Sequence, residues 1–131
     1  MLLESLKATE EIRLTALNAG DIDTVVEIEG GAVGFGWAAT AIRKHSVQRF
    51  RAGLVRWLGR TEEFEIEIAD SEYRVVGQTG LVLGTLVRRE KPKDGPALTR
   101  YLRYSATYVL EGERWRMVQY HRSPMPTKST Q

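Results

Sequence analysis

The stretch LVRWLGRTEEFEIEIA (residues 54–69) holds the change of pattern that decides the fold. Up to Gly59, apolar residues recur at the three- and four-residue spacing of a helix. Beyond it, Phe64, Ile66 and Ile68 alternate with polar residues, which is the two-residue period of a half-buried strand. Helical patterns before this point and strand patterns after it predict an α+β domain.

The first part of the chain predicts three helices and one short strand. Leucines at helical spacing indicate a helix over residues 2–18, and Asp21 is placed to cap a second helix that ends at Glu29. The glycine-interrupted run 32–37 suits a short buried strand. Residues 41–58 are expected to form a third, amphipathic helix whose arginines lie off its apolar stripe.

Four antiparallel strands are expected to follow. They are predicted over residues 64–76, 79–89, 98–110 and 114–122. The alternation slips around Asp70, which predicts a bulge there. The second of these strands carries apolar residues at both parities, so both of its faces need cover. One face can pack on the helices and the other needs a partner, and we therefore expect a homodimer through the sheet.

Length and composition predict one cytoplasmic domain. The chain has 131 residues, of which 42% are hydrophobic and 27% charged, and this suits a single domain over 1–124 with a flexible tail over 125–131. The absence of cysteine excludes disulfides, Cys-type zinc sites and thiol nucleophiles. The longest uncharged stretch, residues 30–42, is too short to cross a bilayer, and the N-terminus does not resemble a signal peptide.

The charges form two opposed blocks. Residues 40–60 hold six Lys and Arg without an acid, and residues 62–72 hold six Asp and Glu. Because the blocks cancel and no nucleic-acid motif accompanies them, we expect neither a nucleic-acid nor a membrane partner. The two histidines, His45 and His121, lie on different predicted elements, and no nucleotide motif is present. We therefore expect no metal and no cofactor.

The order of elements and the closing segment together resemble a known superfamily. Gly112, Trp115, Val118, His121 and Ser123 meet the pattern of its last strand, with one additional residue before the tryptophan. The chain resembles the nuclear transport factor 2-like superfamily, most closely its SnoaL-like branch, and is similar to the association domain of calcium/calmodulin-dependent protein kinase II.

The resemblance implies a cone-shaped barrel, made of a strongly curved antiparallel sheet packed on about three N-terminal helices. It also implies a pocket between sheet and helices and a dimer. Relatives of this fold include isomerases, cyclases and dehydratases as well as domains that only bind or assemble, so the fold does not choose the function.

Two interpretations of the last hairpin are open. A two-residue turn at Gly112-Glu113 pairs Tyr104 with His121 on the apolar face and opposes Arg103 to Arg122 on the other. His121 would then be the acid/base of the site and Tyr104 a hydrogen-bond donor. The resemblance to the kinase association domain instead places Arg122 in the pocket.

The sequence thus predicts a protein that binds an apolar or carboxylate-bearing small molecule. Isomerase, cyclase or dehydratase chemistry is the predicted class of reaction for an enzyme of this kind. The predicted ligand contacts are Trp37, Trp57, Tyr108, Arg103 and Arg122. The alternative is a non-catalytic assembly or regulatory module, which the lack of an aspartate in the predicted pocket favours.

Overall fold

The computed structural model describes residues 1–35, 42–43 and 46–126. Its helices are α1 (Leu2–Ala19), α2 (Ile22–Glu29) and α3 (Val47–Gly59). Its strands are β1 (Gly34–Phe35), β2 (Ile42–Arg43), β3 (Thr61–Val76), β4 (Thr79–Pro92), β5 (Leu98–Glu111) and β6 (Arg114–Pro124). Helices come first and four long strands follow, which confirms the predicted α+β class.

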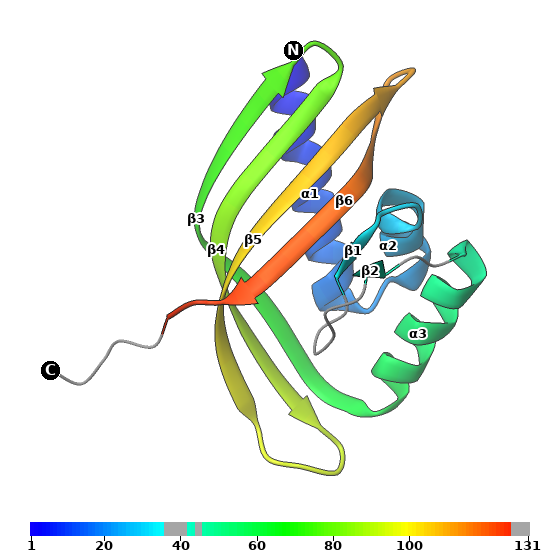
Figure 1. Cartoon of the computed structure of the whole chain (residues 1–131). Helices are drawn as coiled ribbons and strands as arrows, with labels where there is room; N and C mark the ends of the chain where they lie inside the picture. Colours follow the sequence, from blue (N-terminus) through cyan, green and yellow to red (C-terminus); the bar gives the residue numbers. More distant parts are fainter. Residues whose placement is uncertain (36–41, 44–45, 127–131) are drawn as a thin grey trace, which may run out of the picture.

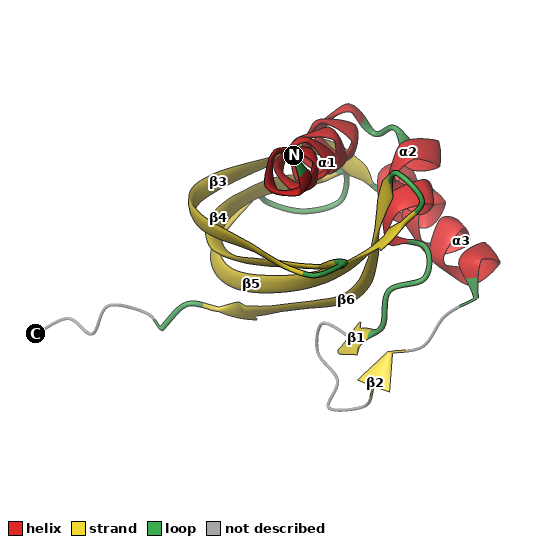
Figure 2. Ribbon diagram, turned by 90° about the horizontal axis from the view of Figure 1, so that it is seen from above, coloured by secondary structure: helices red, strands yellow, loops and turns green. Residues whose placement is uncertain are grey.

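The four long strands form one antiparallel sheet in the order β3-β4-β5-β6. The sheet curls strongly around α1 without closing into a barrel (Figures 1 and 2). We call the side that faces the helices the inner face and the opposite side the outer face. Figure 2 shows the helices gathered on the inner side of the sheet. The short hairpin of β1 and β2 lies beyond β6, where Val33 pairs with Gln119 of that strand.

The core lies between α1 and the inner face. Leu6 of α1 is fully buried, and so is Tyr108 of β5. On β4, Val82 and Leu86 point inward and are each 1% exposed, whereas Leu83 points outward and is 62% exposed. The structure therefore confirms that β4 has two apolar faces, of which the helices cover one.

The helix boundaries follow the capping residues. The side chain of Asp21 accepts a hydrogen bond from the Thr24 backbone N–H (3.3 Å), as predicted for the start of α2. The predicted start of the third helix at residue 41 is wrong. The Ser46 hydroxyl caps α3 by accepting from the Arg49 backbone N–H (3.1 Å), and β2 occupies Ile42–Arg43. No residue of α3 is fully buried.

Register shifts in β3 and β6 set which side chains point inward. The predicted bulge in β3 is confirmed, because the pairing with β4 shifts between Ile68 and Asp70. Two further shifts were not predicted by the alternation. One lies between Thr61 and Glu63 at the start of β3, and the other adds one residue to β6 opposite the step from Thr107 to Tyr108. The predicted pairs next to the turn hold as far as Tyr108 with Met117. Beyond the bulge every predicted pair is displaced by one residue.

The C-terminal tail and the hydropathy of the helices bear on the remaining predictions. Residues 127–131, most of the predicted tail, lie outside the described residues. Among the described helices, none combines the length and the apolar character that crossing a membrane requires.

Candidate functional site

Two charged residues of α1 lie in the middle of the apolar core. Glu10 and Arg13 are 0% and 1% exposed, respectively. The guanidinium of Arg13 donates two hydrogen bonds to the Glu10 carboxylate, at 2.7 and 3.0 Å, and a third to Glu29 of α2 at 2.9 Å. Burial of such ions is costly unless each polar atom has a partner, and this geometry supplies the partners.

Two tyrosines of β5 complete this network from the sheet. The Tyr104 hydroxyl donates to one Glu10 oxygen at 3.0 Å, and the Tyr108 hydroxyl donates to the other at 2.5 Å. Burial and the negative charge of Glu10 raise the pKa of both tyrosines far above the usual range, so both hydroxyls stay protonated. Both hydroxyl protons are directed to Glu10, so in this arrangement the two tyrosines donate hydrogen bonds within the core.

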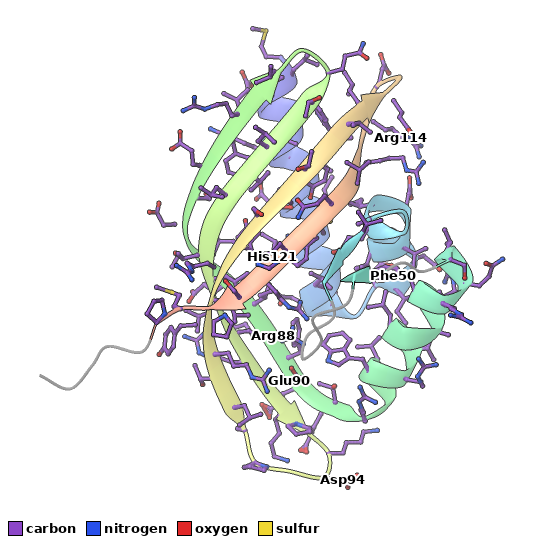
Figure 3. All side chains as sticks on the ribbon, viewed as in Figure 1. Phe50, Arg88, Glu90, Asp94, Arg114 and His121 are labelled. Carbon is purple, nitrogen blue, oxygen red and sulfur yellow. The ribbon has the colours of Figure 1, made fainter. Side chains whose placement is uncertain are left out.

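A second cluster occupies the inner face near α3. The Trp57 indole donates to Glu90 at 2.9 Å, and Arg88 forms an ion pair with the same carboxylate at 3.0 Å. The Trp57 ring meets Phe64 edge-on at 4.6 Å, and the Arg88 guanidinium lies 5.0 Å from the Phe64 ring centre. Figure 3 shows Arg88 and Glu90 below the bend of the sheet, on the side of α3.

Arg122 of β6 belongs to the same region. It pairs with Tyr104 across the strands and therefore shares the inner face. Burial lowers the pKa of Arg88, and the positive charge of Arg122 lowers it further, which places the two guanidiniums within electrostatic reach. The Tyr120 ring lies 6.0 Å from Arg122 and 5.3 Å from Arg13, so it connects this region to the buried network. We call Trp57, Phe64, Arg88, Glu90, Tyr120 and Arg122 the inner-face cluster.

The outer face carries a hollow of about 410 Å³ at the bend of the sheet. Two consecutive cross-strand rows line it. One row is Asp70, Thr85, Arg103 and Ser123, from β3 to β6. The next row is Glu72, Leu83, Ser105 and His121. Acidic residues thus stand on the β3 side of the hollow, and Arg103 and His121 stand on the side of β5 and β6.

The bulge in β6 separates the two residues predicted to share a catalytic site. The prediction that Tyr104 faces His121 is wrong, because Tyr104 pairs with Arg122 and His121 pairs with Ser105. His121 therefore lies on the outer face while Tyr104 is buried on the inner face. The predicted opposition of Arg103 and Arg122 is wrong for the same reason.

The predicted ligand contacts fall into four places. Trp57 and Arg122 both belong to the inner-face cluster, and Tyr108 lies deeper, fully buried against Glu10. Arg103 lies on the outer face. Trp37 lies outside the described residues.

Glu10 and Arg13 were not among the predicted site residues. A sequence signal for them exists, because they fall on the same helical stripe as Leu6 and Leu17, at spacings of four, three and four residues. Two opposite charges within an apolar stripe indicate a buried ion pair. The partners on β5 follow only from the fold.

Comparison with known protein families shows to which family the chain belongs. The SnoaL-like domain family matches residues 9–128. The chain belongs to the SnoaL-like domain family. A sequence search of curated proteins finds no match.

Solved structures share the fold of this SnoaL-like domain at low sequence identity. A candidate dehydratase of the NTF2-like family from Streptomyces avermitilis has a TM-score of 0.80 at 16% identity, covering 95% of this chain and 97% of that one. A candidate calcium/calmodulin-dependent protein kinase II association domain from Xanthomonas campestris has a TM-score of 0.75 at 18% identity, covering 93% and 86%. A protein with a cystatin-like fold from Caulobacter vibrioides has a TM-score of 0.77 at 16% identity, covering 95% and 89%. The first of these structures is named as an enzyme and the second as an association domain, which are the two kinds of function predicted from the sequence. Sequence identity of 16–18% supports a shared fold alone.

Proposed function

We propose that this SnoaL-like domain binds a small carboxylate-bearing molecule at the inner-face cluster. The observation that carries the proposal is that Arg88 and Arg122 share the inner face beside aromatic rings, with Arg88 5.0 Å from the Phe64 ring centre and Arg122 6.0 Å from that of Tyr120. In keeping with this placement, the positive charge of Arg122 lowers the pKa of Arg88. Glu90 balances one of the two positive charges of the cluster. A ligand carboxylate beside Arg88 and Arg122 can balance the other while it accepts charge-assisted hydrogen bonds. The rings of Trp57, Phe64 and Tyr120 supply a flat surface for the apolar part of the ligand.

The test measures binding of benzoate by ¹⁵N–¹H NMR titration, with benzamide as the neutral probe of the same shape. Benzoate is expected to bind, and Arg122→Gln or Arg88→Gln should weaken it about 10-fold or more, since a hydrogen bond to a charged group contributes roughly 1.5–3 kcal/mol. Arg103→Gln is the matched control, because it removes the same charge from the outer face. Equal binding of benzamide, or loss of benzoate only with Arg103→Gln, contradicts the inner-face site.

Dehydratase, isomerase or cyclase turnover is the catalytic extension of this proposal. It draws support from the solved relatives named as candidate dehydratases. Glu90 is the carboxylate within the cluster, and its bonds to Trp57 and Arg88 place it beside the proposed carboxylate site, so we assign proton transfer to Glu90. Loss of turnover with Glu90→Gln while benzoate still binds supports that role.

The second candidate is a non-catalytic assembly module, which a different observation favours. Three large apolar side chains of the outer face, Leu81, Leu83 and Tyr101, are 40–62% exposed. A surface of this kind marks an interaction site more often than an ordinary solvated face. A protein that forms a stable oligomer and binds no carboxylate would fit this function instead.

A further inference from the structure

The carboxylate of Glu90 on β4 is held by donors from two elements. Its Oε1 accepts a hydrogen bond from Nε of Arg88 at 3.1 Å and lies 3.0 Å from Nη2 of the same guanidinium. Its Oε2 accepts from the indole N–H of Trp57, on α3, at 2.9 Å. The Arg88 and Glu90 side chains are 14% and 24% exposed, so these bonds are largely shielded from water. The inner-face cluster thus contains a set of donors for one carboxylate, and a residue of the chain itself fills it.

The bonds that Arg88 makes to Glu90 are those that a ligand carboxylate would need. Nε and Nη2 form a planar fork of the kind that binds a carboxylate strongly. In this structure both nitrogens lie within bonding distance of a single Glu90 oxygen. A second carboxylate on the same guanidinium would stand close to the first, and the two negative charges would repel each other. A ligand carboxylate can therefore make its strongest bonds to Arg88 only when Glu90 has moved away.

Glu90 can leave this place at a lower cost than the buried acid of the core. Glu10 is 0% exposed, so it has no route to water, whereas Glu90 is already 24% exposed and its released carboxylate can be hydrated. The rings of Trp57 and Phe64 contact each other edge-on at 4.6 Å. This ring contact does not include Glu90, so the aromatic surface remains when the carboxylate moves.

We propose that Glu90 is an internal competitor of the ligand, and that a ligand carboxylate displaces it from Arg88 and from the Trp57 indole. The inference rests on the proposed carboxylate site and deepens it by naming the residue that sets affinity and selectivity there. Because binding exchanges one carboxylate for another, a neutral amide, which cannot replace the charge on Arg88, is rejected. The exchange also releases Glu90 from its two partners (Figure 3) for the proton transfer assigned to it above.

Glu90→Gln tests the competition, with benzoate as the probe and ¹⁵N–¹H NMR titration as the measurement. Glutamine keeps the shape of the side chain and can still accept from the Trp57 indole, but it no longer holds Arg88 by charge. Benzoate should bind this variant about 10-fold more tightly than wild type, because no charge-assisted bond has to be broken first. Glu65→Gln is the matched control. It removes the acid of an ion pair with Arg89 (3.0 Å) on the outer face and should leave the affinity for benzoate unchanged.

The same substitution in an Arg88→Gln background separates displacement from a long-range effect of charge. If Glu90 weakens binding by occupying Arg88, then Glu90→Gln gains no affinity once Arg88 is absent. If the Glu90 charge instead repels benzoate through space, the gain is the same in both backgrounds. The four proteins form a double-mutant cycle, and its coupling free energy distinguishes the two cases.

The possible results separate this inference from the proposed function on which it rests. Tighter binding by Glu90→Gln that disappears in the Arg88→Gln background supports the competition. If wild type binds benzoate and Glu90→Gln binds it equally or more weakly, or gains the same affinity in both backgrounds, the competition is overturned and the carboxylate site stands. If neither wild type nor Glu90→Gln binds benzoate, the carboxylate site itself is wrong and the competition falls with it.

Discussion

At the scale of single residues, the buried pair of Glu10 and Arg13 is the feature whose loss is expected to lower the free energy of unfolding most. Both ions are removed from water, and their stability depends on bonds to each other, to Glu29 and to the hydroxyls of Tyr104 and Tyr108. The described side chains show no buried polar atom without a hydrogen-bond partner, so this network is fully satisfied. Removing one member leaves its buried partner with fewer hydrogen bonds.

Glu10→Gln is expected to lower the free energy of unfolding by about 3–5 kcal/mol, since it leaves the Arg13 charge buried with one carboxylate partner fewer. Replacing the network with apolar residues, as Met at positions 10 and 13 and Phe at 104 and 108, should recover most of that loss, because only Glu29, which is partly exposed to water, then loses its ion-pair partner. Urea denaturation at neutral pH measures the free energy of unfolding of both variants. Glu4→Gln on the exposed side of α1 is the control. A quadruple variant with a lower free energy of unfolding than Glu10→Gln would contradict this account.

The same network predicts how stability depends on pH. Burial raises the pKa of Glu10, but Arg13 and the two tyrosine hydroxyls outweigh burial and hold the pKa below its ordinary 4.5. The unfolded chain therefore binds a proton more readily than the native chain, so the contribution of Glu10 is complete above about pH 4.5 and is lost as the pH falls through the native pKa. The stability difference between wild type and Glu10→Gln should narrow in acid. If the difference in the free energy of unfolding between the two proteins stays constant down to about pH 3, the pKa of Glu10 is not lowered by folding.

At the scale of elements, two bulges decide which residues face the helices. The slip of alternation at Asp70 was visible in the sequence, because polar and apolar positions exchange there. The bulge in β6 has no such signature, since both parities of Trp115–Tyr120 hold apolar or long side chains. Its position reverses the faces of His121 and Arg122, so the inner-face cluster could not be derived from alternation alone.

The bend of the sheet depends on a missing side chain at Gly84. A Cβ atom there would lie 2.7 Å from the Asp70 carbonyl oxygen and 2.8 Å from the Tyr104 ring. Since backbone must move to accept it, Gly84→Ala should lower the free energy of unfolding by about 1–3 kcal/mol. Gly59→Ala, where the added Cβ meets nothing within 4 Å, should stay within about 0.5 kcal/mol. Thermal or urea unfolding of the two variants compares them directly, and equal stabilities would show that the close approach at Gly84 relaxes freely.

At the scale of the whole molecule, the curled sheet has two different surfaces. Its inner face holds the buried network and the inner-face cluster, and its outer face holds the exposed side chains of Leu81, Leu83 and Tyr101 and the hollow at the bend. The proposed carboxylate site uses the inner face alone, and Arg103→Gln changes the outer face as its control.

The sequence by itself determined the class of the fold, most element boundaries, the bulge in β3 and the two apolar faces of β4. These properties depend on hydrophobic period and capping, which are local along the chain. Only the tertiary structure decided the rest. Arg88 and Arg122 share the inner face, and Glu10 accepts hydrogen bonds from Tyr104 and Tyr108, across many residues of sequence. A single added residue in β6 and the curl of the sheet bring them together, and neither the register of distant strands nor curvature is encoded in a local pattern.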